Sequence, residues 1–108
     1  MRVASVIQVI AVLVRFELKD EVAAHGFDAL VKETVAAVQA LEPETLIYAV
    51  HNVEDSPLSR VFYEVYGSPD ARRHHESTEH MKRAFDELGQ YVESAQLDNL
   101  GEPLGKLG

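Results

Sequence analysis

Apolar residues are nearly continuous from about Ser5 to Glu17, in a run rich in valine and isoleucine. Such a run is typical of a strand that is covered on both faces, because a half-exposed strand alternates apolar and polar positions. The pattern therefore predicts a first strand here. It also indicates that both sides of the sheet are occupied.

The next segment changes to helical spacing. Asp20 is suited to cap a helix, and Glu21 lies in the first turn, where the helix dipole favours a negative charge. Pro43 ends the helix, because the residue before a proline avoids the α region. One buried stripe is expected on this helix, formed by Phe27, Leu30, Val31, Val35, Val38 and Leu41.

Two further strands are predicted from Thr45 to Val53 and from Arg60 to Tyr66, where strand-forming residues dominate. The intervening Glu-Asp-Ser-Pro has the composition of a turn, so the two strands are expected to form a hairpin. Alternation along the second strand places Phe62, Glu64 and Tyr66 on one face.

Ser68 and Pro69 indicate the next helix start, as the N-cap and the first helical position. A short helix is expected to about Glu76, after which Ser77 or Thr78 caps a further helix. The alternative is one bent helix. The apolar positions of this second segment are Met81, Ala84, Phe85, Leu88, Tyr91 and Val92.

The pattern weakens after Ser94, with a short last strand predicted from about Ala95 to Leu100. We expect one domain over residues 1–96 and a C-terminal tail over 97–108. The order β-α-β-β-α-β predicts an α+β fold of the ferredoxin-like, split βαβ type, with an antiparallel sheet.

Helices cover only one face of such a sheet, yet the predicted strands are apolar on both faces. The uncovered face has to be buried by something, and a second sheet from an identical subunit is the simplest cover. The residues themselves therefore predict a homodimer that forms by sheet-to-sheet packing.

Composition narrows the possible partners. The 108 residues carry a formal net charge of -8, which argues against nucleic acid and against an anionic membrane as partners. Cysteine is absent, and this excludes disulfides and thiolate sites. The apolar start is interrupted by Gln8 and Arg15, so we expect no signal peptide and a cytoplasmic protein. No glycine-rich nucleotide motif is present, and no cofactor is expected.

The densest polar cluster spans residues 70–80 and holds His74, His75 and His80. On one or two helices, His75 and His80 could approach one cavity. A metal would need a third ligand from elsewhere, so no metal site is expected. The simpler interpretation is that both histidines pack with one ring nitrogen hydrogen-bonded.

A second polar group comes from the strands. Tyr48 and Asn52 share one face of their strand, and His51 lies on the other. Glu64, beside Tyr66 on the next strand, has to be paired or have a raised pKa among such apolar neighbours. The simpler of these alternatives is a salt bridge from Glu64 to Arg60, Arg72 or Arg73.

Three motifs in this order resemble those of a known family. The segment 42–48, Glu-Pro-Glu-Thr-Leu-Ile-Tyr, is similar to the family's Glu-Pro-Gly-x-Leu-x-Tyr, with Glu44 in place of glycine. Residues 62–66, Phe-Tyr-Glu-Val-Tyr, are similar to its following strand. The helical residues that match its pattern are Ala71, His75, Thr78, His80 and Met81. Over about residues 9–92 the chain resembles the antibiotic biosynthesis monooxygenases, which are dimeric α+β barrels.

The resemblance implies a homodimer and a cavity between sheet and helices. Some members oxidise quinols or aromatic polyketides with molecular oxygen and no cofactor, after a base deprotonates the substrate. His75 is then the expected base, with Glu64 and Tyr48 as its catalytic neighbours. Tyr66, His80 and Asn52 are expected to bind the small aromatic substrate. Haem-degrading members use a tryptophan, and this chain has none.

Two other functions stay open from the sequence. The histidines and the glutamate suit an isomerase or lyase that moves protons beside a carbonyl equally well. The third possibility is a catalytically inactive dimer that binds a small molecule.

Overall fold

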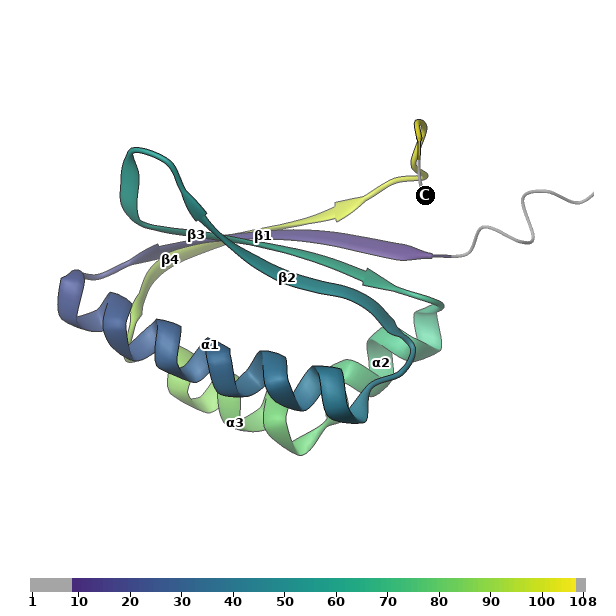
Figure 1. Ribbon diagram of the computed structural model, residues 1–108, viewed down its shortest axis with the longest axis horizontal. Coiled ribbons are helices and arrows are strands. Elements are labelled where there is room, and N and C mark those ends of the chain that lie inside the picture. The colour runs from purple at the N-terminus through teal and green to yellow at the C-terminus, as the bar shows by residue number, and fades with distance from the viewer. Residues whose placement is uncertain (1–8, 107–108) are drawn as a thin grey trace, which may run out of the picture.

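Four antiparallel strands form one sheet, and three helices lie on one of its faces (Figure 1). The computed structural model describes residues 9–106. Its elements are β1 (Ile10–Leu18), α1 (Glu21–Leu41), β2 (Thr45–Val53), β3 (Ser56–Tyr66), α2 (Pro69–Ser77), α3 (Glu79–Leu88) and β4 (Val92–Leu100). The strand order is β2-β3-β1-β4. The ferredoxin-like α+β prediction is confirmed, while residues 5–8 of the predicted first strand lie outside the described part.

The predicted helix starts are confirmed by their caps. Asp20 accepts a hydrogen bond from the backbone N–H of Ala23 at 2.7 Å, and Ser68 accepts one from Ala71 at 3.0 Å. Thr78 has extended backbone angles and accepts a hydrogen bond from the N–H of Met81, so it ends α2 and caps α3. The chain therefore forms two helices here rather than one bent helix.

The hairpin is tighter than predicted. β3 begins at Ser56 instead of Arg60, and only Glu54 and Asp55 form the turn. Asp55 takes a positive φ of 62°, which aspartate tolerates better than most residues. Pro57 can lie inside β3 because the pairing with β1 stops at Ser59, so its missing N–H removes no bond to β1.

Two apolar positions expected on helices lie elsewhere. α3 ends at Leu88, so Tyr91 follows it in a turn and Val92 already belongs to β4. The ring of Tyr91 lies where a side chain at Gly26 would be, since a Cβ at Gly26 would approach Tyr91 to 2.4 Å. Leu41 of α1 is exposed, although Val38 and Glu42 on either side of it are buried. β4 runs to Leu100, four residues beyond the expected domain end at 96.

The core lies between the sheet and the helices. Phe27 of α1, Phe62 of β3 and Phe16 of β1 form a cluster with ring centroids 5.4 to 6.2 Å apart. A partly exposed ion pair also joins the two layers, because Arg60 donates to both carboxylate oxygens of Asp28 at 2.9 and 3.0 Å. Packing and charge thus hold α1 on the sheet.

The other face of the sheet has no helix over it (Figure 1). Strand register places an entirely apolar row across all four strands on this face, namely Ile47, Val65, Ala11 and Leu100. The next row holds Ala49, Tyr63 and Leu13, with Asp98 of β4 at its edge. At the opposite end of the face, Arg15 and Glu17 form an ion pair. This outer face is therefore apolar at one end and polar at the other.

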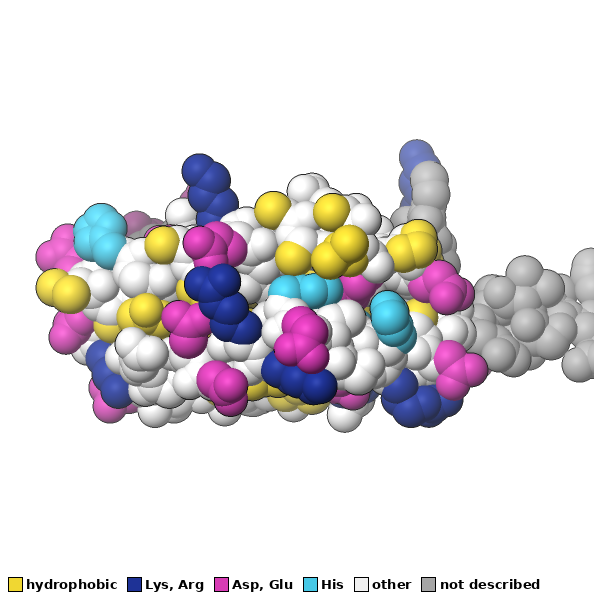
Figure 2. Space-filling model, turned by 90° about the horizontal axis from the view of Figure 1, so that it is seen from below, with side chains coloured by type: hydrophobic (Ala, Val, Ile, Leu, Met, Phe, Trp, Pro, Cys, Tyr) yellow, Lys and Arg dark blue, Asp and Glu magenta, His cyan; other side chains and the backbone are white. Residues whose placement is uncertain are grey.

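The helical side differs from this outer face. Basic and acidic side chains are interspersed over it, and the apolar side chains are scattered among them (Figure 2). Within the described residues, no helix combines the length and the apolar character that a membrane span needs.

Candidate functional site

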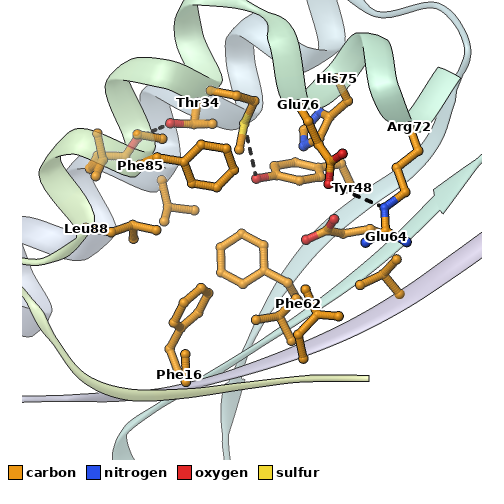
Figure 3. Close-up of a pocket in the computed structure, with 18 of the residues that line it drawn as sticks. Phe16, Thr34, Tyr48, Phe62, Glu64, Arg72, His75, Glu76, Phe85 and Leu88 are labelled. Atoms are coloured by element: carbon orange, nitrogen blue, oxygen red, sulfur yellow. Dashed lines mark hydrogen bonds and ion pairs between the residues drawn. The ribbon is translucent and has the colours of Figure 1, made fainter. Parts of the chain in front are cut away.

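A cavity of about 300 Å³ lies between the sheet and the helices (Figure 3). Its walls are mostly aromatic and aliphatic, and they include Val14, Phe16, Phe62, Phe85, Leu88 and Leu97. Polar side chains gather at one end, where β2, β3 and α2 meet; they are Tyr48, Glu64, Tyr66, Arg72, His75 and Glu76. The cavity thus combines an apolar body with a polar end, as small-molecule sites commonly do.

Glu64 comes from β3 and faces the cavity. Its carboxyl accepts a hydrogen bond from the hydroxyl of Tyr66 at 2.5 Å. Burial raises the pKa of Glu64, although the Tyr66 hydrogen bond and the nearby positive charge of Arg72 oppose this. Glu64 therefore keeps its proton to a higher pH than an exposed glutamate does, as the sequence suggested for an unpaired carboxyl.

The salt bridge predicted for Glu64 is wrong. Arg60 binds Asp28, and Arg73 pairs with Asp70 on its own helix. Arg72 lines the cavity, but its guanidinium donates to Asn99 at 2.7 Å and to Glu76 at 3.4 Å. The sequence could not show that each arginine has a nearer partner.

The two cavity tyrosines stay protonated over the ordinary pH range. Burial, first, and the neighbouring carboxylates raise the pKa of both Tyr48 and Tyr66. The hydroxyl of Tyr48 lies 3.8 Å from the sulfur of Met81, a weak acceptor. Tyr48 is therefore a hydrogen-bond donor with no strong partner of its own.

His75 is buried between these two rings, with centroids 5.1 Å from Tyr48 and 5.2 Å from Tyr66. Its Nδ1 lies 2.7 Å from Oε1 of Glu42. No fully enclosed side-chain nitrogen or oxygen in the described residues lacks a partner, and Nδ1 accounts for the hydrogen bond of this ring. We conclude that the free Nε2 of His75 opens onto the cavity that the ring lines.

Glu42 is the residue that sequence reasoning missed. It follows α1 directly and is buried, and it accepts hydrogen bonds from Thr45 at 2.6 Å, from His75 and from Nε2 of His80. Burial raises its pKa, but the bonds from Thr45, His80 and His75 outweigh this and hold the pKa below its usual value. We call these four residues the Glu42 cluster.

The sequence held one signal for this cluster. Glu42 begins the Glu-Pro motif, and the two histidines belong to the later helical motif. Nothing in the spacing of these motifs indicated that Glu42 contacts the histidines. The contact depends on how α2 and α3 pack against the end of α1, which is a tertiary feature.

The six residues proposed from the sequence divide into two groups. Tyr48, Glu64, Tyr66 and His75 all line the cavity. His80 lines a separate hollow between α1 and α3, and Asn52 is exposed near the hairpin. Of the residues the structure describes, no three histidine, aspartate or glutamate side chains are grouped so that they could hold a metal ion.

This geometry defines the class of protein: a two-layer α+β domain with a small cavity between the sheet and the helices. The sequence model of the family described as antibiotic biosynthesis monooxygenase matches residues 9–87. The chain belongs to this family.

Solved structures agree on the fold. A proposed antibiotic biosynthesis monooxygenase from Bacteroides thetaiotaomicron is 21% identical, with a TM-score of 0.85 over 94% of this chain and 95% of that one. A second, from Caulobacter crescentus, is 23% identical, with a TM-score of 0.83 over 91% and 92%. A proposed monooxygenase from Lactobacillus acidophilus is 28% identical, with a TM-score of 0.82 over 87% of this chain and 44% of that one. No curated protein matches the sequence.

Proposed function

We propose that this protein is a cofactor-independent monooxygenase that acts on a small phenol or quinol. Membership of the antibiotic biosynthesis monooxygenase family supports the reaction class. The observation that carries the substrate class is the cavity, whose walls are apolar and aromatic and whose polar end presents a free imidazole nitrogen. A volume at the low end of the range for ligand sites, about 300–1,000 Å³, suits a molecule of one or two rings.

The chemistry follows from the polar end. Nε2 of His75 takes the proton of the phenol, and the electron-rich phenolate reacts with oxygen, forming a carbon–oxygen bond at a ring carbon that bears hydrogen and lies ortho or para to the hydroxyl. His75 returns its proton to the terminal peroxide oxygen and then accepts the proton from that ring carbon as the oxygen–oxygen bond breaks. Hydroxide leaves and takes this proton, so phenol and oxygen give a quinone and water. The ring loses four electrons, and oxygen gains them.

The neighbours of His75 have separate roles in this scheme. The hydroxyl of Tyr48 donates a hydrogen bond to the substrate oxygen, where negative charge develops, and Glu64 donates a second one while it holds its proton. Buried Phe62 lies beside the substrate ring and limits the access of water to the peroxide. No step requires a metal or an organic cofactor.

A homodimer is part of the proposal. The apolar row Ile47, Val65, Ala11 and Leu100 crosses the whole outer face and offers an area for a second sheet. We expect a dimer at micromolar concentration in analytical ultracentrifugation, and a monomer after Tyr63→Lys. A wild-type monomer would contradict this part. A cytoplasmic location also belongs to the proposal, since a chain without cysteine is compatible with a reducing compartment.

Oxygen uptake tests the activity. The protein is incubated with menadiol, 1-naphthol and related phenols, and oxygen consumption and quinone formation are measured against buffer alone. We expect uptake in the wild type and a loss of roughly 100-fold or more in His75→Gln, which removes the base. His74→Gln on the exposed side of α2 is the matched control. Absence of uptake across the panel would contradict the proposed activity.

An isomerase that moves a proton beside a carbonyl is the second candidate, because Arg72 lines the polar end and could hold an anionic group. Its existing bonds to Glu76 and Asn99 make this weaker than the oxidative proposal. Solvent deuterium incorporation into a small keto acid, without oxygen uptake, would favour the second candidate.

A further inference from the structure

The cavity has a second end, which differs in chemistry from the polar one. Tyr48 and His75 lie at the polar end, while Phe85 and Leu88 lie on the other side of the cavity (Figure 3). Phe85 of α3 and Leu97 of β4 both line the cavity, yet they are 52% and 51% exposed. Two large apolar side chains thus border an opening between α3 and β4, which we call the apolar mouth.

Strand register places the polar end and the apolar mouth at opposite edges of the sheet. Tyr48 lies on β2 opposite Glu64 of β3, whereas Leu97 lies on β4 opposite Val14 of β1. Because β2 and β4 are the two edge strands, three interstrand spacings of about 4.8 Å, or ~14 Å in total, separate them. A single aromatic ring held at the polar end is much shorter than this distance and leaves the mouth empty.

The edge of the cavity along β4 is bridged at one position and open at the next. Arg72 of α2 donates a hydrogen bond to the side chain of Asn99 at 2.7 Å, and this bond joins the helices to β4 beside the polar end. Leu97 lies two residues along β4 and therefore points to the same face of the strand. Neither Leu97 nor Phe85 has a polar group that could form such a bridge. A long ligand is thus directed toward the apolar mouth.

We propose that the ligand of this cavity is a phenol or quinol whose ring carries an unbranched apolar substituent that extends through the apolar mouth. The hydroxyl group lies at the polar end, the ring lies beside Phe62, and the substituent passes between Phe85 and Leu97. These two side chains select the substituent and take no part in the reaction. The identity of the ring rests on the proposed function, whereas the path of the substituent rests on the form of the cavity.

A ligand suits the mouth better than a partner subunit does. Leu97 points to the helix side of the sheet, where it lines the cavity. The apolar row proposed for the dimer lies on the other side, and its member on β4 is Leu100. Large apolar side chains that stay exposed beside a cavity are typical of a ligand-binding surface. Because the chain carries a net charge of -8, a neutral substituent is favoured over an anionic one.

A series of para-alkylphenols tests the contact with the substituent. Isothermal titration calorimetry gives the affinity of the wild type for para-ethylphenol, para-butylphenol and para-hexylphenol. We expect the association constant to rise about twofold to fourfold with each added methylene group, since full burial of one such group gives about fourfold. Equal affinity across the series, or no binding, would overturn the proposal.

A polar group at the end of the chain tests whether the substituent leaves the cavity. The ligand is para-hexylphenol with a neutral triethylene glycol at its end, and para-hexylphenol itself is the reference. If the chain passes through the mouth, the glycol stays in water and the two affinities agree within about tenfold. A larger loss would show that the chain ends inside the cavity, because burial of ether oxygens is costly. That result would overturn the proposal.

Leu97→Asn tests the assignment of the mouth. We expect the affinity for para-hexylphenol to fall about fivefold or more, while the affinity for para-ethylphenol changes less than about twofold. Binding of para-ethylphenol also shows that the variant is folded. Leu104→Asn, at a fully exposed leucine of the tail, is the control and should leave both affinities unchanged. An equal loss for both ligands in Leu97→Asn would overturn the assignment.

This inference and the proposed function fail separately. If no phenol or quinol is oxidised but the alkylphenols bind as expected, the proposed reaction is wrong and the mouth assignment stands. If quinols are oxidised while affinity does not depend on chain length, the substrate is a compact ring and the inference is wrong. If Leu97→Asn converts a dimer into a monomer, the partner subunit covers the mouth, and the inference is wrong as well.

Discussion

Glu42 and Glu64 both lie between the sheet and the helices of one small domain, yet their surroundings act in opposite directions. Three side-chain donors surround Glu42, and they lower its pKa despite burial. Glu64 has one donor, Tyr66, and burial raises its pKa. The number of donors, rather than depth alone, thus decides whether the pKa of a buried carboxyl is lowered or raised.

The two glutamates also differ in the role that their surroundings allow. The Glu42 cluster is saturated with internal hydrogen bonds, so it orients the histidines and has no capacity left for a ligand. The region around Glu64 has unused donors and acceptors at the wall of a cavity. A binding site needs polar groups that are free to bind a ligand, as around Glu64. It also needs a rigid support whose hydrogen bonds are all made within the protein, as in the Glu42 cluster.

Removing the Glu42 carboxylate should have the largest effect on stability. Glu42→Ala leaves the buried imidazole of His75, the partly buried imidazole of His80 and Thr45 without their acceptor, and loss of one partner of such a buried group is expected to lower the free energy of unfolding by about 3–5 kcal/mol. Urea denaturation at fixed protein concentration measures the change. Glu44→Ala, an exposed glutamate two residues away, is the control. If Glu42→Ala lowers the free energy of unfolding no more than Glu44→Ala does, Glu42 is not a stabilising charged group and its contrast with Glu64 is wrong.

The pH dependence of stability should differ in sign between the two carboxyls. Because the pKa of Glu42 is lowered on folding, its contribution is present above the unfolded pKa and is lost as pH falls through the folded pKa. Because the pKa of Glu64 is raised, its contribution is present below the unfolded pKa and is lost as pH rises through the folded pKa.

Subtracting variant from wild-type stability at each pH tests these signs. The wild type should lose its advantage over Glu42→Gln on acidification. It should lose stability relative to Glu64→Gln as pH rises from acid to neutral. If the two difference curves of stability against pH have the same slope, the pKa values of Glu42 and Glu64 shift in the same direction on folding, and the predicted contrast is wrong.

Tyr66→Phe should have a smaller effect. It removes one hydrogen bond between partly buried groups, for which a loss of about 1 kcal/mol is typical. Because the Tyr66 hydroxyl lowers the pKa of Glu64, its removal should raise that pKa further. Carbon-13 detection of the Glu64 carboxyl gives the titration, and Tyr63→Phe on the outer face is the matched control. A lower pKa of Glu64 in Tyr66→Phe would contradict the assigned role of the bond.

Glu64→Gln should have the smallest effect on stability, within about 0.5 kcal/mol at acid pH, where the carboxyl of the wild type is protonated. The amide is neutral, as a protonated carboxyl is, and its oxygen can still accept from Tyr66. Affinity for 1-naphthol, measured by isothermal titration calorimetry, should change more than stability does. A stability loss as large as that of Glu42→Gln would mean that Glu64 is also a charged structural group.

Periodicity in the sequence was enough to predict which β3 side chains share the face that lines the cavity. The period of two along β3 placed Phe62, Glu64 and Tyr66 together, and Tyr48 joined them through the hairpin register. The same rule put Asn52 on the correct face but could not show that this part of β2 lies away from the cavity. Alternation determines a face, and only the packing of helices determines which part of that face is covered.

The Glu42 cluster could not be predicted in the same way. It joins the end of α1 to α2 and α3 over 33 and 38 residues of sequence. A glutamate before a proline, at the end of a helix, is normally exposed to solvent. Its burial results from tertiary contacts that no local pattern encodes, and the same holds for the bond between Arg72 and Asn99.

The half-exposed side chains of Phe85 and Leu97 line the cavity, so it opens to the surface between α3 and β4. Such side chains change rotamer within picoseconds to nanoseconds, far faster than loops or domains open. A small molecule could thus enter and leave by side-chain rotation alone. Association should then approach diffusion control, with short residence times. The chemical step, rather than product release, is then expected to limit the rate of turnover.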